Sequence, residues 1–151
     1  MTIALAAHAL AAAIWVGGMF FAYMALRPAA SPLSPAERLP LWQRSFARFF
    51  RWVWAAIAVL LATGYWIVFA EWGGFAAAGV HVHIMQALGI LMMLLFLHLW
   101  FAPYGRFRRA LGAGDLAGAA AQLDQIRRIV GINLLLGLVV IAIGASGRSW
   151  G

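Results

Sequence analysis

The segment "TIALAAHALAAAIWVGGMFFAYMAL", residues 2–26, contains no charged side chain and decides the class of fold. Three further uncharged stretches occupy residues 52–70, 72–105 and 129–147. Each can supply the roughly 20 apolar residues that cross a bilayer as a helix. The sequence therefore predicts an integral membrane protein. Its four predicted spans lie at about 3–26, 52–70, 80–103 and 127–147.

The composition agrees with a membrane protein and limits the chemistry that the chain can support. Of its 151 residues, 66% are hydrophobic and 10% are charged, whereas about 25% are charged in soluble domains. The absence of cysteine excludes disulfides, thiolate zinc sites, iron–sulfur clusters and covalently attached haem. A metal bound by this chain needs histidine, methionine or oxygen ligands.

Ten of the eleven basic residues, all of them arginines, lie in the first and third connections between the predicted spans. They are Arg27, Arg38, Arg44, Arg48, Arg51, Arg106, Arg108, Arg109, Arg127 and Arg128. Arginine-rich connections stay on the cytoplasmic side of a membrane. We therefore expect both termini on the outer, periplasmic side of a bacterial inner membrane. The net charge of +7 is explained by topology and by contact with anionic lipid, so nucleic acid is not an expected partner.

Short connections favour antiparallel neighbours, so residues 1–151 are expected to form one all-α, antiparallel four-helix bundle. The order Ser34-Pro35 is typical of a helix start. It predicts a short interfacial helix that turns four aromatic residues toward the bilayer. These are Trp42, Phe46, Phe49 and Phe50. Asp115 is the expected N-cap of a fourth helix that runs from the cytoplasm into the membrane.

Histidines inside apolar spans indicate function, because an ionisable group is costly in the bilayer. With a rise of about 1.5 Å per residue, His8 and His83 are expected at similar depths on two helices that run in the same direction. Two facing imidazoles are the usual axial ligands of a six-coordinate b-type haem. We expect His8 and His83 to ligate haem b, with His83 facing the bundle and His81 at its rim.

Other residues complete this expected site. Trp15, one heptad after His8, should line the porphyrin, and Gly18 and Gly89 should leave room for it. His98 lies about 22 Å beyond His83 along its helix and cannot share the site. A hydrogen bond to the backbone or to Asn133 is its expected role.

Copper offers a competing interpretation of the same region. His81, His83 and Met85 alternate as H-x-H-x-M, and imidazole with thioether suits copper, especially Cu(I). Residues that alternate on a helix point to different faces, which weakens the case for a single site formed by all three. Copper bound by His8, His81, His83 and Met85 is thus the alternative to haem.

Two stretches resemble known families of membrane proteins. The opening "LAAHALAAAIWVGGMFF", with His8, Trp15 and a glycine pair, resembles the first helix of the CopD family, named for copper resistance. The stretch "GVHVHIMQALGILMMLLFLHLWFAPYGRFRRAL" resembles the third helix of the related HemJ-type protoporphyrinogen oxidases, which bind haem b. In the HemJ pattern a histidine in helix one, matched by His8, acts with a lysine in helix three. His83 stands where that lysine would be.

The first resemblance implies copper handling, including uptake from a periplasmic copper carrier. The second implies haem, and the histidine in place of lysine argues against protoporphyrinogen oxidation and for bis-histidine ligation. Our first hypothesis is therefore electron transfer by a b-type haem, with quinone or another redox partner. Copper binding or transport is the alternative and porphyrinogen oxidation a further one. The sequence is compatible with a haem-dependent membrane oxidoreductase but does not decide whether the protein is an enzyme. It also leaves open whether the protein forms a homo-oligomer.

Overall fold

The computed structural model describes residues 2–150, which form an all-α bundle without strands. Four helical segments are long and apolar enough to cross a membrane, so the chain is a multi-pass membrane protein. The α-helices are α1 (Thr2–Phe21), α2 (Arg27–Ala30), α3 (Pro35–Trp66), α4 (Val80–Phe101), α5 (Pro103–Gly112) and α6 (Leu116–Ser146). The π-helical turns Ala22–Leu26 and Ile67–Glu71 continue α1 and α3, and the 3₁₀ turns are Phe75–Ala77 and Gly147–Ser149.

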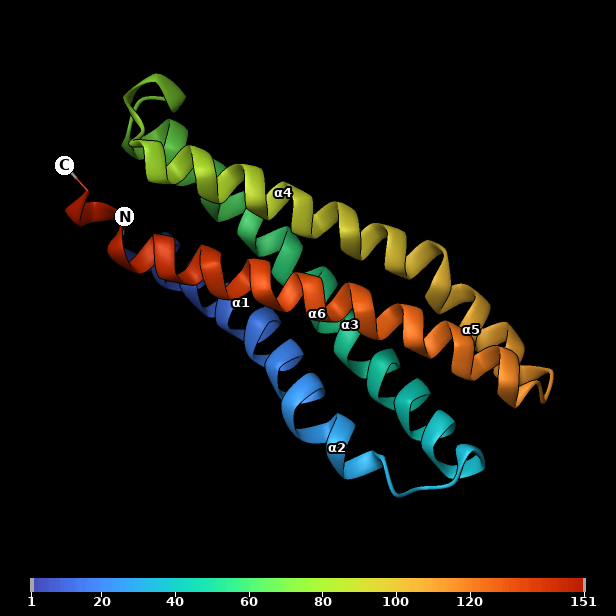
Figure 1. The fold of residues 1–151 in the computed structure, drawn as a ribbon. Coiled ribbons are helices and arrows are strands. Elements are labelled where there is room, and N and C mark those ends of the chain that lie inside the picture. Colours follow the sequence, from blue (N-terminus) through green and yellow to red (C-terminus); the bar gives the residue numbers. More distant parts are fainter. Residues whose placement is uncertain (1, 151) are drawn as a thin grey trace.

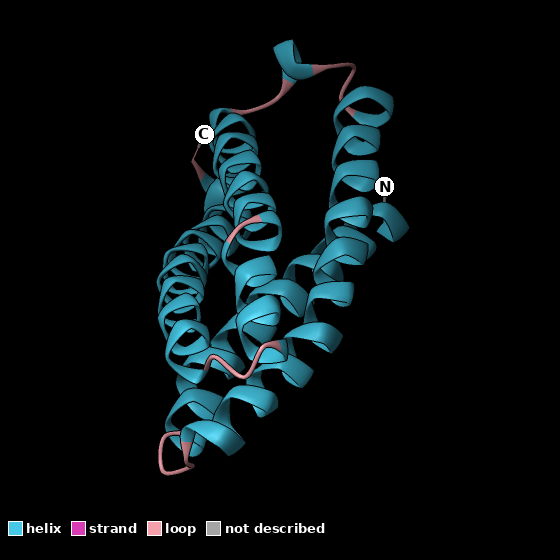
Figure 2. Cartoon of the chain, turned by 90° about the vertical axis from the view of Figure 1, so that its right-hand side faces the viewer, coloured by secondary structure: helices cyan, strands magenta, loops and turns pink. Residues whose placement is uncertain are grey.

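The bundle has two chemically different ends (Figure 1). The two ends of the chain and the loop at 72–79 lie at one end, which we call the histidine end because His8, His81 and His83 lie there. Figure 2 shows that loop arching from α3 to α4. The other two connections lie at the opposite end, together with the ten arginines that flank them, and we call this the arginine end. Helix α1 packs against α3 and α6, and α4 packs mainly on α6.

Both predicted helix starts are confirmed. The Glu37 carboxylate accepts hydrogen bonds from the backbone N–H and the hydroxyl of Ser34, at 3.3 and 2.9 Å, which closes a capping box at the start of α3. At the start of α6, the Asp115 carboxylate accepts from the backbone N–H of Gly118 at 2.9 Å. These caps supply partners for N–H groups that a helix start would leave unpaired.

The prediction of a separate interfacial helix is wrong. Helix α3 continues without interruption from the connection into the apolar span. Trp42, Phe46 and Phe50 follow one another at intervals of four residues, so they share one face, and all three are buried within the bundle. Phe49 is partly buried against the same core. A continuous helix lets this aromatic face pack inward, which buries more apolar surface than a stay at the interface.

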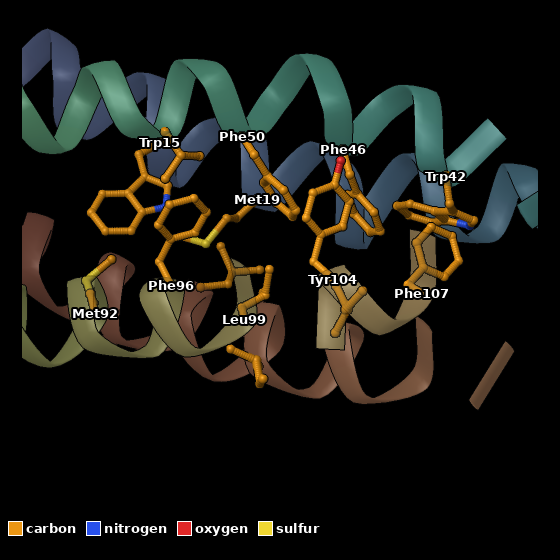
Figure 3. Close-up of a cluster of buried hydrophobic side chains, with 14 of the residues drawn as sticks. Trp15, Met19, Trp42, Phe46, Phe50, Met92, Phe96, Leu99, Tyr104 and Phe107 are labelled. Carbon is orange, nitrogen blue, oxygen red and sulfur yellow. The ribbon is translucent and has the colours of Figure 1, made fainter. Parts of the chain in front are cut away.

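The buried aromatic face of α3 belongs to a column of rings that fills the arginine half of the bundle (Figure 3). Phe50 contacts the rings of Phe96 on α4 and Tyr104 on α5, at centroid distances of 5.5 and 4.9 Å with steep interplanar angles. Phe46 contacts Phe107 of α5 at 6.2 Å. Edge-to-face pairs of this kind add to the packing energy. The column supplies much of the buried core of the bundle.

Candidate functional site

His8 is held by a two-step hydrogen-bond chain on α3. Its Nδ1 lies 2.9 Å from the hydroxyl oxygen of Thr63, and that hydroxyl donates its one hydrogen to the carbonyl of Val59 at 2.6 Å. The hydroxyl oxygen therefore accepts from Nδ1–H of His8. The His8 ring also has a hydrogen bond with the backbone of Leu60, so two residues of α3 orient it. A histidine that ligates a metal is usually oriented in this way, by a hydrogen bond from its other ring nitrogen.

A glycine on α3 makes room for the His8 ring. A Cβ atom placed on Gly64 would lie 3.2 Å from Cε1 of His8, closer than ordinary van der Waals contact. The residue next to Thr63 therefore has to be small for the hydrogen bond to form. The sequence analysis did not identify Thr63 or Gly64, although a lone threonine in an apolar span is a recognisable signal.

Helix α4 also has a glycine in its apolar span. A Cβ on Gly89 would meet nothing within 4 Å. A role of Gly89 beside a bound cofactor stays a prediction.

The antiparallel helix α6 supplies a glycine at the depth of His8. A Cβ on Gly137 would lie 2.6 Å from the Val16 side chain, so these two positions are level. Seven residues further toward the histidine end, Gly144 is level with Ala9, the neighbour of His8. Gly64 of α3 and Gly144 of α6 therefore lie near the level of His8.

The two histidines that open α4 point to different neighbours. The ring of His81 packs on the end of α6, where a Cβ on Gly147 would lie 2.5 Å from its Cγ, and it meets the Trp150 ring at 6.5 Å. The ring of His83 is exposed and lies 5.9 Å from the ring of Phe75 in the 72–79 loop. The expectation that His83 faces the bundle and His81 the rim is thus reversed.

Contacts with α6 give the relative depth of His8 and His83. Gly137 lies against Val16 of α1, and Gly147, ten residues later, lies against His81 of α4. Because α1 and α4 both run antiparallel to α6, stepping back ten residues from Val16 pairs Ala6 with His81, and therefore His8 with His83. The His83 ring contacts Phe75, and ligation of one haem by His8 and His83 stays a prediction.

His81 and Met85 do share a face. They are four residues apart on α4, and both pack on α6: Cε and Sδ of Met85 would lie 3.0 and 3.6 Å from a Cβ on Gly144. His81 packs in the same way on Gly147, three residues later. The H-x-H-x-M stretch therefore presents one imidazole and one thioether to α6, and the second imidazole to the loop.

The remaining predicted site residues serve packing. Trp15 is 3% exposed and its ring lies in the bundle core. Gly18 is covered by the ring of Phe49, so it provides a close helix contact and no space for a porphyrin. The predicted hydrogen bond of the His98 ring to the backbone or to Asn133 is not present among the described residues, and the Asn133 amide donates instead to the Met92 carbonyl at 3.1 Å. His98 itself is exposed.

The described residues contain no group of three or more histidine, aspartate or glutamate side chains that could hold a metal ion. A site here has to draw on methionine or on few ligands. The family model of Copper resistance protein D, CopD, matches residues 43–146. The chain belongs to the CopD family. The match includes His81, His83 and Met85, and His8 precedes it.

Neither the curated proteins nor the solved structures contain a match to the chain. Family membership marks this CopD-family chain as a copper-resistance-related membrane protein, and the residues that carry its chemistry have to be argued from its own geometry.

Proposed function

We propose that this CopD-family protein binds Cu(I) at the histidine end of its bundle, with His81 and Met85 as ligands, and exchanges the ion with a periplasmic copper carrier. The observation that carries the proposal is the shared face of these two side chains on α4. Imidazole and thioether are soft ligands that favour Cu(I). No change of oxidation state is required for such exchange.

The surroundings of the pair favour a small ion. Gly144 of α6 and Gly147 of the 3₁₀ turn that follows it let both side chains lie close to the backbone. His8 lies near the depth of Met85 and adds a second imidazole to this end of the bundle.

A Cu(I) titration tests the proposal. The detergent-purified protein is titrated without oxygen against bicinchoninate, a chromophoric Cu(I) chelator. Structural zinc sites contribute about 10–16 kcal/mol from four ligands, or roughly 3 kcal/mol per ligand, so removing one of the two proposed ligands should weaken Cu(I) binding by about a hundredfold. The test variants are His81→Ala and Met85→Leu.

Each test variant has a matched control. His98→Ala removes an exposed imidazole and Met24→Leu an exposed thioether, both away from the proposed site. Leucine conserves the volume of methionine, so packing changes little. The controls should bind Cu(I) as the unchanged protein does. Equal affinities in Met85→Leu and Met24→Leu would reject the site.

The proposal also requires the histidine end to face the periplasm of a bacterial inner membrane. The ten arginines at the opposite end support this orientation, because basic connections stay in the cytoplasm. Reporter fusions near Arg38 and Asp115 should therefore report a cytoplasmic location, and a fusion near Gly74 a periplasmic one. A periplasmic signal at Asp115 would contradict the orientation.

Haem b with electron transfer is the second candidate, and His8 is the observation that favours it. Its ring is oriented by Thr63, and Gly64 lies against it. To ligate the same haem, the His83 ring would have to turn away from Phe75. An absorption spectrum separates the two candidates: a colourless protein that binds copper supports the first, and a sharp Soret band that is lost in His8→Ala supports the second.

A further inference from the structure

The arginine end contains a cluster of three arginines from three different elements. Arg27 belongs to α2, Arg38 to the first turn of α3 and Arg127 to α6, and the charges of the first two act on the third. Arg127 forms an ion pair with Asp124, with 3.2 Å between Nη1 and Oδ1. One carboxylate faces three guanidinium groups, so the cluster retains positive charge.

Two buried N–H groups in this cluster lack an acceptor. They are Nε of Arg127 and Nε1 of Trp42, neither of which has a hydrogen-bond partner among the described residues. The Trp42 side chain is 2% exposed, and the Arg127 guanidinium lies 5.6 Å from the centroid of its ring. Buried donors are normally paired, and each unpaired one calls for an explanation.

The cluster is open on the side of Arg27. That residue is exposed, and its guanidinium lies over the Tyr23 ring at 4.9 Å. Arg38 donates one hydrogen bond to the Leu33 carbonyl at 3.0 Å and keeps its other N–H groups available. An anion can therefore approach past Arg27 toward the buried donors of Arg127 and Trp42.

We infer that Arg27, Arg38, Arg127 and Trp42 form a binding site for a phosphate group, supplied by the headgroup of an anionic phospholipid or by a free phosphate ion. Guanidinium groups bind phosphate oxygens with two parallel hydrogen bonds, and phosphate supplies the acceptors that the two buried N–H groups lack. The site lies at the opposite end of the bundle from the proposed copper ligands, so it is independent of them.

Native mass spectrometry of the detergent-purified protein tests the inference. Dioleoyl phosphatidylglycerol is the anionic probe and dioleoyl phosphatidylcholine the neutral one. Arg127→Gln removes the central guanidinium, and Arg128→Gln removes the same charge from the exposed neighbouring residue of the same helix. Loss of a charge-assisted hydrogen bond should weaken phosphatidylglycerol binding by about tenfold in Arg127→Gln. Arg128→Gln should change it by less than about twofold.

A milder variant protects the test against misfolding. Trp42→Phe keeps an aromatic ring in the core and removes the indole N–H, and it should weaken phosphatidylglycerol binding by about threefold. Helix content by circular dichroism and elution volume on size exclusion should match the unchanged protein. Equal losses in Arg127→Gln and Arg128→Gln would overturn the inference in favour of diffuse attraction, and so would unchanged binding in Trp42→Phe.

Inorganic phosphate distinguishes the two sources. If millimolar phosphate displaces phosphatidylglycerol from the unchanged protein, and does so less well in Trp42→Phe, the site accepts the free ion. If phosphate has no effect while the Arg127 and Trp42 variants still lose the lipid, the site is specific for a lipid headgroup. Both results support a phosphate site, and equal binding of the anionic and the neutral lipid would overturn it.

Discussion

Replacing Thr63 with valine tests the hydrogen bond that orients His8. Valine keeps the branched shape and removes only the hydroxyl that accepts from Nδ1–H. Side-chain hydrogen bonds between membrane helices contribute on average about 0.6 kcal/mol and at most about 1.7 kcal/mol. Because this bond is short, at 2.9 Å, and partly buried, we expect the free energy of unfolding to fall by about 1 kcal/mol.

The variant should also change the tautomer of His8. With its acceptor gone, Nδ1–H loses its advantage, and the Nε2–H form, which the free side chain prefers, should increase. Imidazole ¹⁵N shifts of histidine-labelled protein distinguish the protonated from the bare nitrogen, and the His8 signals are those that disappear in His8→Gln. Metal binding through Nε2 should weaken by about tenfold, as when other orienting partners of ligands are removed.

Ser146→Ala is the matched control for Thr63→Val. It removes a hydroxyl at the same end of the bundle, and that hydroxyl donates only within its own helix, to the Ala142 carbonyl at 2.8 Å. Its stability should change by less than about 0.5 kcal/mol. An Nε2–H tautomer of His8 in the unchanged protein would refute the reasoning, because the Thr63 hydroxyl would then not be the acceptor.

Two further predictions concern packing, and the free energy of unfolding in bicelles measures both. Gly137→Ala should destabilise the bundle by about 1–3 kcal/mol because the new Cβ would lie 2.6 Å from Val16. Gly17→Ala is the control, since its Cβ would meet nothing within 4 Å, and it should leave the stability unchanged. Equal stabilities of the two variants would contradict the close contact. Phe50→Ala should lower the free energy of unfolding by about 3–5 kcal/mol by opening a cavity. Phe101 is 74% exposed, so Phe101→Ala should lower it little. A small loss in Phe50→Ala would mean that the aromatic column does not stabilise the bundle.

Helix starts and the chemistry of the two ends were predictable from local signals. Ser34 and Asp115 are caps whose partners lie three residues away, so no distant contact is needed to recognise them. The ten arginines lie in the half of the bundle that contains the first and third connections, because the sequence places all of them between the first and second or the third and fourth apolar stretches. The long interruption-free α3 was not predictable in this way, since its aromatic face is stabilised by α4 and α5, which follow much later in the chain.

The candidate sites show the same division. Histidines in apolar spans can be recognised as candidate site residues from the sequence. Helical periodicity alone places His81 and Met85 on one face. Which histidine lies against α6 depends on how α4 is rotated about its axis, and this is a property of packing between helices. The phosphate site was likewise invisible, because Trp42 and Arg127 meet only when α3 packs against α6.

The sequence by itself determined a four-span, all-α membrane protein whose arginines are concentrated toward one end. Hydropathy and the positions of the arginines can be read from the sequence without knowing which helices pack together. Only the tertiary structure decided the hydrogen bond between His8 and Thr63 and the packing of His81 and Met85 against α6. Each of these depends on the relative axial positions of two helices. Those positions are set by close contacts such as that of Gly137 with Val16, and many alternative registers share the same pattern of apolar residues along the chain.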